Sequence, residues 1–315
     1  MVSQNEICMV VVYMGKLPIW MPAFLTSCAH NHTIDWMIFT DSEAHYLDIP
    51  NNVYLKPLEL NQLLSLATHV MGCKVSFENP KKICDLKPIY GDIFSSQLSQ
   101  YEYWGHCDLD IIWGDLQSFL NNIDYKVYDI ISTRKNTLCG HFTLFQNNME
   151  INQLYKQVPN YHKIFQNNIH YGFDEGAFSF WLDQKLRKKE LSFKIFWPRK
   201  YSADWPELEI KPLGWKWSKG KILSRIGEER IYLHFMTWKK SMSNIDFTGS
   251  KQQSFRINRY GIWSKKGKLT QEVKFILPLH WPKLLLHYFK KIKGKIFLTQ
   301  RLEGPIIPEH LREIS

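Results

Sequence analysis

Two aspartates separated by a single residue are the group in this sequence most able to do chemistry. Asp108 and Asp110 lie in the segment Trp-Gly-His-Cys-Asp-Leu-Asp-Ile-Ile-Trp-Gly-Asp-Leu at residues 104–116. On an extended chain, side chains two residues apart point to the same side. Neighbouring carboxylates repel unless a positive charge lies between them, and a divalent cation with oxygen ligands suits that position. The pair therefore predicts a metal ion at the end of a strand.

The elements that must position this pair follow an α/β order. An apolar run at residues 7–12 predicts a strand buried on both faces, helical spacing after Pro18 predicts a helix, and residues 35–40 predict a second strand. This β-α-β order implies a parallel sheet. Asp85 is expected to be the N-cap of a helix at residues 87–98. Further strands are predicted at residues 53–55, 129–132, 141–145 and 232–235, and further helices at residues 60–70 and from residue 174.

Several acids follow predicted strands directly. Asp41 comes after the second strand, and Asp108 and Asp110 come after the apolar residues that precede them. In open α/β sheets, ligands bind outside the carboxyl ends of the strands. A ligand site is therefore expected at this edge of the sheet.

Bulk composition limits the class of protein. The chain has 315 residues, 44% of them hydrophobic, which is enough for one large domain or a domain with an appendage. The net charge of +10 fits nucleic acid, an anionic membrane or a phosphorylated small molecule as partner. None of the six cysteines forms a C-x-x-C pair, which argues against structural zinc and favours a reduced, intracellular protein. Neither a signal peptide nor a transmembrane helix is expected.

The last part of the chain differs from the rest in charge. Ser, Asn, Gly and Gln cluster at residues 241–254, which predicts a division into a domain of residues 1–245 and a C-terminal extension of residues 246–315. Residues 278–301 combine basic with apolar side chains and contain no acid. This segment is interpreted either as a contact with an anionic membrane or as a terminal helix docked on the core.

Further motifs occur in a definite order along the chain. Tyr13 lies near the end of the first strand, and the second strand ends in Phe39-Thr40-Asp41. The later motifs are Asp85-Leu86-Lys87-Pro88-Ile89-Tyr90-Gly91, Cys139-Gly140-His141-Phe142, Gly172-Phe173-Asp174-Glu175, and Tyr232-Leu233-His234-Phe235 followed by Lys239 and Lys240.

With the aspartate pair, these motifs make residues 5–240 resemble the nucleotide-sugar-dependent glycosyltransferases of the GT-A fold. Within that class the chain is similar to bacterial enzymes that build capsular, lipopolysaccharide or other surface glycans. The resemblance implies an α/β fold with a mixed, mostly parallel sheet flanked by helices. It also implies a nucleotide-diphosphate sugar donor, a glycan or lipid-linked glycan acceptor, Mn²⁺ or Mg²⁺ as cofactor, and no nucleic acid partner. The expected location is the cytoplasm, with peripheral contact at the inner face of the cytoplasmic membrane.

The resemblance also implies roles for single residues on the donor side. Asp108, Asp110 and His234 would hold the metal, and Asp108 would also meet the donor. The remaining donor-binding positions are Tyr13, Asp41, Lys87 and one of Lys239 and Lys240. Ordinary structural roles stay open: packing for Tyr13, a surface position for Lys87, and a structural histidine within an aromatic strand for His234.

The implied reaction moves a hexose from the donor to an acceptor hydroxyl. A bound cation neutralises the charge on the departing diphosphate. Asp174 and Glu175 are the candidate catalytic bases, with Asp174 preferred, while Gly140 and His141 would line the acceptor site. Helix capping also explains acids at a helix start, and a plain turn also explains Gly140. Inversion and retention both stay open.

Two other classes of protein compete with this interpretation. A metal-dependent phosphoester hydrolase would commonly need two metals and more clustered acids, whereas the third acid here, Asp115, follows a glycine and is typical of a turn. A nucleic-acid-binding protein fits the net charge and the aromatic content, but the basic residues concentrate late in the chain and no nucleic-acid-binding motif is recognised.

Overall fold

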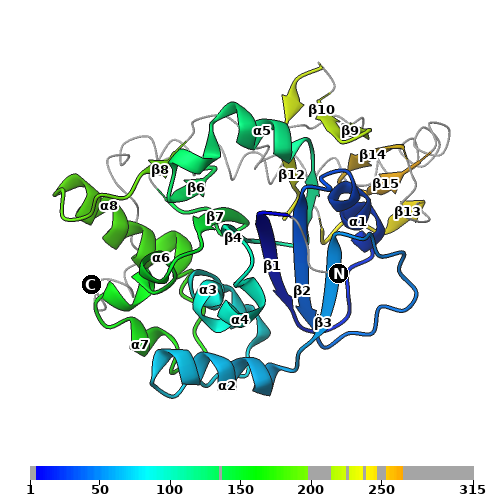
Figure 1. Cartoon of the computed structure of the whole chain (residues 1–315). Helices are drawn as coiled ribbons and strands as arrows, with labels where there is room; N and C mark the ends of the chain where they lie inside the picture. Colours follow the sequence, from blue (N-terminus) through cyan, green and yellow to red (C-terminus); the bar gives the residue numbers. More distant parts are fainter. Residues whose placement is uncertain are drawn as a thin grey trace, which may run out of the picture.

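A computed structural model of the chain describes residues 5–134, 137–197, 214–224, 227–236, 239–246 and 253–264. They form a mixed α/β fold with a large sheet, a second sheet and a two-stranded pair (Figure 1). The strands are β1 (Ile7–Tyr13), β2 (Ile34–Thr40), β3 (Val53–Pro57), β4 (Tyr103–Cys107), β5 (Ile111–Trp113), β6 (Ile130–Ser132), β7 (Phe142–Gln146), β8 (Ile195–Phe196), β9 (Trp215–Ser218), β10 (Lys221–Leu223), β11 (Glu229–Arg230), β12 (Tyr232–His234), β13 (Asn244–Asp246), β14 (Ser254–Asn258) and β15 (Gly261–Trp263). The helices are α1 (Met21–Ala29), α2 (Leu60–Met71), η1 (Pro80–Ile89), α3 (Tyr90–Ile93), α4 (Ser95–Leu98), α5 (Leu116–Asn122), η2 (Tyr125–Val127), α6 (Met149–Asn152), η3 (Leu154–Gln157), α7 (Tyr161–Ile164), η4 (Asp174–Phe178) and α8 (Ser179–Arg187).

The main sheet has seven strands in the order β3-β2-β1-β4-β7-β6-β8. Strands β3, β2, β1 and β4 are parallel to one another, β7 is antiparallel to both β4 and β6, and β8 is parallel to β6. Helices flank this mostly parallel sheet, so the fold class predicted from the sequence is confirmed (Figure 1).

Both faces of the main sheet are covered, which explains the unbroken apolar runs of its strands. Ile7, Met9 and Val11 of β1 belong to one core together with residues of α1 and α5. The alternating residues Cys8 and Val10 belong to a second core on the other face, with residues of α2, η1, α3 and α8. The period of two along the strand thus assigns successive side chains to opposite layers.

The prediction of one continuous helix at residues 87–98 is wrong. A 3-10 helix, η1, covers Pro80–Ile89 and is followed by two short helices, α3 and α4. Asn79, not Asp85, caps η1 by accepting a hydrogen bond from the Lys81 amide. Asp85 is instead fully buried within η1. Pro88 lies inside η1.

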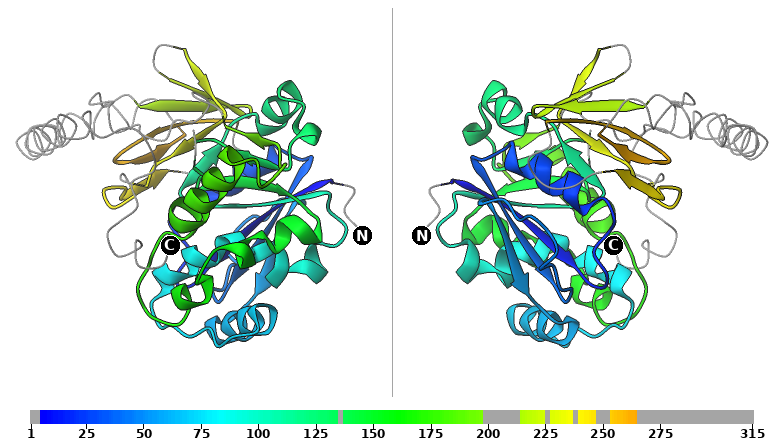
Figure 2. Two further views of the ribbon diagram at one scale, coloured as in Figure 1. Left: turned by 90° about the vertical axis from the view of Figure 1, so that its left-hand side faces the viewer. Right: turned by 90° about the vertical axis from the view of Figure 1, so that its right-hand side faces the viewer.

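The second sheet has the strand order β11-β10-β9-β14-β15-β13 and groups at one end of the molecule, in yellow and orange in Figure 2. Trp217 donates its Nε1 hydrogen to the Trp113 carbonyl over 2.8 Å, which ties this sheet to β5. Because β14 pairs with β9, the sheet continues across the boundary predicted at residue 245, and the division into two domains stays a prediction. The basic segment at residues 278–301 lies outside the described residues.

Within the described ranges, no helix combines the length and the apolar character needed to cross a bilayer.

Candidate active site

Strand pairing brings the aspartate pair and the late histidine together. Asp108 and Asp110 lie between β4 and β5, at the carboxyl end of a parallel strand of the main sheet. Strand β12 pairs antiparallel with β5 and places His234 opposite Ile111. The Phe235 amide donates to the Asp110 carbonyl over 3.0 Å and extends this pairing. Three side chains that are far apart in sequence thus meet at one edge of the sheet.

One ligand atom from each of these three residues faces a common point. The Nε2 atom of His234 lies 3.9 Å from Oδ2 of Asp108 and 3.5 Å from Oδ1 of Asp110. One possible ligand atom from each of Asp108, Asp110 and His234 lies within 4.8 Å of the other two. Two carboxylate oxygens and one imidazole nitrogen are a donor set that suits a divalent cation such as Mn²⁺.

The surroundings of the His234 ring favour the binding of a cation at its Nε2 atom. Its Nε2 atom is buried and has no hydrogen-bond partner among the described residues. A buried polar atom without a partner is costly, and a metal ligated at Nε2 would remove that cost. The ring stacks on His141 with centroids 4.0 Å apart, and His141 Nε2 lies 2.9 Å from the Tyr232 hydroxyl. These contacts fix the plane in which Nε2 points.

Two lysines neutralise the remaining oxygens of the aspartates. Lys87 Nζ donates to Oδ1 of Asp108 over 2.5 Å and to the Gly140 carbonyl over 2.6 Å. Lys239 Nζ donates to Oδ2 of Asp110 over 2.8 Å. Burial opposes the charged form of Lys87, but the Asp108 carboxylate raises the pKa of Lys87 well above its usual value. Burial likewise opposes ionisation of Asp110, yet His234 and Lys239 lower the pKa of its carboxyl.

The predicted acids Asp174 and Glu175 meet the predicted loop at Gly140. The Gly140 amide donates to Oε1 of Glu175 over 2.8 Å, and Arg134 Nη1 donates to the same oxygen over 2.8 Å. A Cβ atom on residue 140 would lie 2.8 Å from Oδ2 of Asp174 and 2.9 Å from Oε1 of Glu175. Only glycine leaves both carboxylates this close to the backbone.

The two acids differ in their electrostatic surroundings. Burial raises the pKa of Asp174 to about 7, with Lys87 opposing the shift and Glu175 adding to it. Glu175 is partly exposed and held by Arg134. Asp174 can therefore gain or lose a proton near neutral pH, whereas Glu175 is fixed in place by two donors.

The turn that carries Asp174 is anchored by Asp85. Oδ2 of Asp85 accepts a hydrogen bond from the Tyr171 amide and Oδ1 accepts one from the Phe173 amide, each over 3.0 Å. Lys82 donates to Oδ2 over 2.9 Å, and the side chains of this ion pair are both 0% exposed. The residue expected to be a helix cap is thus an anchor that joins η1 to the turn before η4. Local sequence gave no signal for this contact, because its partners lie about ninety residues further on.

The remaining predicted site residues differ in their burial and in their contacts. Burial raises the pKa of Tyr13, the charge of Lys239 lowers it, and the charge of Asp110 raises it further. Asp41 is exposed, and its Oδ1 atom accepts a hydrogen bond from the Gly15 amide over 2.7 Å. Lys240 is exposed. His141 is buried, and its ring stacks on that of His234.

The structure also adds two residues that the sequence did not single out. Arg134 holds Glu175, and Trp20 donates its Nε1 hydrogen to the Leu109 carbonyl, between the two aspartates, over 2.8 Å.

Cys139, His141 and Glu175 form a second trio that could hold a metal. However, Cys139 Sγ lies 3.3 Å from Nδ1 and 3.1 Å from Nε2 of His141. Nearly equal distances place the sulfur against the face of the ring, away from the in-plane lone pairs that bind metals.

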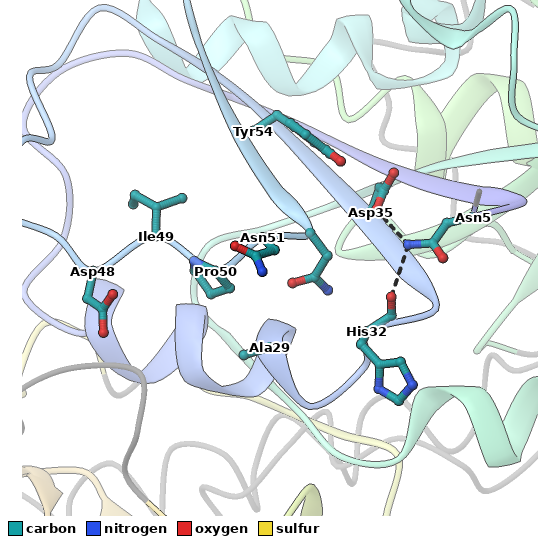
Figure 3. Close-up of a pocket in the computed structure, with 10 residues that line it drawn as sticks. Asn5, Ala29, His32, Asp35, Asp48, Ile49, Pro50, Asn51 and Tyr54 are labelled. Atoms are coloured by element: carbon teal, nitrogen blue, oxygen red, sulfur yellow. Dashed lines mark hydrogen bonds between the residues drawn. The ribbon is translucent and has the colours of Figure 1, made fainter. Parts of the chain in front are cut away.

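A pocket of about 520 Å³ lies at the opposite, amino-terminal edge of β1, β2 and β3 (Figure 3). Asp35 borders it and is buried, accepting hydrogen bonds from Asn5 Nδ2 over 2.7 Å and from the Tyr101 hydroxyl over 2.8 Å. Its position separates it from the cluster of Asp108, Asp110 and His234, because the strands run between them.

The fold and site define a mixed α/β protein with an Asp-X-Asp pair and a histidine at the carboxyl edge of a mostly parallel sheet. A family model described as "Family of unknown function (DUF6625)" matches residues 9–266. The chain belongs to that family. No curated protein matches the chain.

One solved structure similar to this chain is mouse xyloside xylosyltransferase 1 in its apo form, with 9% sequence identity. The alignment covers 73% of this chain and 96% of that chain, with a TM-score of 0.37. A likeness this distant assigns no activity.

Proposed function

We propose that this protein is a metal-dependent glycosyltransferase that uses a nucleotide-diphosphate sugar. The single observation that carries the proposal is the convergence of Asp108 Oδ2, Asp110 Oδ1 and the unpartnered His234 Nε2 at the carboxyl edge of the main sheet. That edge is where open α/β sheets bind ligands. The motif order that resembles GT-A glycosyltransferases supports the same activity.

Asp108, Asp110 and His234 are the proposed ligands of Mn²⁺ or Mg²⁺. When bound, the cation would neutralise charge on the departing diphosphate. Lys87 holds Asp108 and the Gly140 carbonyl together, so it positions the metal ligand relative to the acid pair. Because Lys87 is buried and already has these two acceptors, its role as a phosphate ligand is less favoured than that of Lys239, whose side chain is 40% exposed.

Asp174 is the proposed base for an inverting reaction. Its carboxyl is buried, and burial raises its pKa to about 7, which suits a group that takes up a proton near neutral pH. Glu175 is the weaker candidate, because Arg134 and the Gly140 amide already occupy its Oε1 atom. We assign Glu175 to holding the Gly140 loop, and Gly140 to the acceptor side of the site.

Tyr13 and Asp41 are the proposed contacts for the base and ribose, since both lie at the carboxyl ends of parallel strands. The proposed acceptor is a glycan or lipid-linked glycan of bacterial surface polysaccharide synthesis, with the enzyme at the inner face of the cytoplasmic membrane. The support for acceptor and location is the motif resemblance and the basic composition of residues 278–301.

The phosphoester hydrolase alternative is less well supported. Asp115, the third acid of the central segment, accepts hydrogen bonds from the Ser118 amide and hydroxyl and caps α5. It is thereby occupied as a helix cap, and the cluster of Asp108, Asp110 and His234 provides ligands for one cation. Two-metal hydrolysis would need further acids around that cluster.

The test is a thermal-shift panel of sugar nucleotides with and without Mn²⁺, followed by measurement of nucleoside diphosphate release. A ligand that binds the native state at a hundred times its Kd stabilises by about 2.7 kcal/mol, so we expect a clear rise in Tm. Asp110→Asn should abolish the Mn²⁺-dependent rise. Asp115→Asn is the matched control, because it makes the same charge change and asparagine is as good a helix cap.

Two results would contradict the proposal. One is a protein that responds to no sugar nucleotide in the presence of Mn²⁺. The other is Mn²⁺-dependent hydrolysis of phosphoesters without sugar transfer, which would favour the hydrolase instead.

A further inference from the structure

The two lysines of the candidate site are held in different ways. Lys87 has an exposed fraction of 8% and donates to both Asp108 and the Gly140 carbonyl. The Lys239 side chain is 40% exposed, and its ammonium donates a hydrogen bond to Oδ2 of Asp110. Lys87 is therefore a fixed part of the site, whereas the ammonium of Lys239 has access to solvent and can leave Asp110 when another cation takes its place.

Asp110 is the residue at which a bound cation and Lys239 would meet. Its side chain is 4% exposed, so its charge needs a partner at all times. In the structure that partner is Lys239, at 2.8 Å, while the other oxygen faces His234 Nε2 at 3.5 Å. A divalent cation between Asp110 and His234 would share this one carboxylate with an ammonium of like sign, which costs energy in a poorly solvated site.

We propose that Lys239 is an internal counter-ion of Asp110 which a divalent metal must displace or weaken in order to bind. This inference rests on the proposed metal site. It adds that Lys239, a side chain of the site itself, lowers the affinity of the site for the metal. It also distinguishes Lys239 from Lys240, which is exposed next to it. The ammonium released from Asp110 is then free at the site when the donor diphosphate arrives.

The inference predicts an increase in metal affinity on removal of a site residue. Lys239→Met removes the competing ammonium and keeps most of the side-chain length, so Mn²⁺ should bind the metal-free protein more tightly. The expected gain is about fivefold, which corresponds to an ion pair of ~1 kcal/mol. Mn²⁺ binding is measured directly by electron paramagnetic resonance or calorimetry on the full chain, without donor and without turnover.

Lys240→Met is the matched control. It makes the same change in charge one residue away, so it reports the general effect of removing a positive charge near the site. We expect less than a twofold change in Mn²⁺ affinity for Lys240→Met. Asp110→Asn, alone and combined with Lys239→Met, should bind Mn²⁺ poorly in both cases, because the contested carboxylate is gone.

The outcomes separate this inference from the proposed function. Equal Mn²⁺ affinities for Lys239→Met and Lys240→Met, or weaker binding by Lys239→Met, would overturn the competition while leaving the metal site standing. Loss of turnover with tighter Mn²⁺ binding in Lys239→Met would support both. If neither the unaltered protein nor any variant binds Mn²⁺, the metal site is refuted, and the proposed competition is refuted with it.

Discussion

Two aspartate–lysine pairs within the same fold have opposite characters. Asp85 and Lys82 are both fully buried, and Asp85 uses both carboxylate oxygens on the Tyr171 and Phe173 amides and on Lys82. At the edge of the main sheet, Lys239 donates to Oδ2 of Asp110, and Oδ1 faces a His234 nitrogen that has no hydrogen-bond partner in the described part of the chain.

The difference shows that burial and a lysine partner do not by themselves mark a functional site. Both carboxylate oxygens of Asp85 already accept hydrogen bonds, and the pair joins two segments of the chain. Asp110 retains a carboxylate oxygen aimed at an atom that lacks a partner, and such an arrangement has the capacity to take up a cation. The carboxylate of Asp35 at the Figure 3 pocket resembles Asp85 in this respect, because Asn5 and Tyr101 donate to its two oxygens.

The largest expected effect is a loss of stability when the buried pair of Lys82 and Asp85 is broken. Lys82→Met leaves the buried Asp85 carboxylate without its cation, so the free energy of unfolding should fall by about 3–5 kcal/mol. Chemical denaturation measures this. Lys126→Met is the control, because Lys126 forms half-exposed pairs with Glu6 and Glu102, and its loss should cost less than ~1 kcal/mol. Similar losses of unfolding free energy for Lys82→Met and Lys126→Met would show that the buried pair of Lys82 and Asp85 contributes no more to stability than an exposed pair.

Substitutions in the cluster of Asp108, Asp110 and His234 should change metal affinity rather than stability. His234→Ala removes one proposed ligand, and Mn²⁺ affinity should fall by at least about 100-fold, beyond the roughly 10–100-fold typical of residues that only support a ligand. Calorimetric titration of the metal-free protein measures this. A variant that binds Mn²⁺ as tightly as the unaltered protein would show that His234 is a structural histidine.

Asp174 offers a test through pH. Its pKa is about 7 in the folded protein against 3.8 for the ordinary carboxyl, so between these values the folded state holds a proton that the unfolded state has lost. Stability from this group is therefore present at low pH and declines as pH rises through 7. Relative to Asp174→Asn, the unaltered protein should lose about 2 kcal/mol between pH 5.5 and 7.5. A difference that does not change with pH would place the Asp174 carboxyl in ordinary surroundings.

The smallest expected effect concerns Gly140. Gly140→Ala places a Cβ atom against Asp174 and Glu175, so the acids must move apart at a cost of about 1–2 kcal/mol in stability. The same movement should weaken the contact between the Gly140 amide and Glu175. Thermal denaturation, together with a crystal structure of the variant, would check both. An unchanged position of Glu175 in that structure would contradict the prediction.

Much of the main sheet could be predicted from local sequence. The apolar runs at residues 7–12 and 35–40 became β1 and β2, and the intervening amphipathic pattern became α1, because alternation and helical spacing depend only on neighbouring residues. The helix at residues 87–98 could not be predicted correctly. Asp85, which was expected to cap this helix, is buried within η1, and its amide partners come from residues 171 and 173.

The sequence by itself determined which residue types are available for chemistry: two acids one residue apart after a strand, a glycine before a histidine, and an acid pair after Phe173. Only the tertiary structure decided how they are used. It selected Lys239 as the partner of Asp110, committed Lys87 to Asp108 and Gly140, and turned Asp85 from an expected cap into a buried anchor. The physical reason is that strand and helix patterns arise between neighbours along the chain, whereas charge pairing and burial depend on residues that only folding brings within a few ångströms.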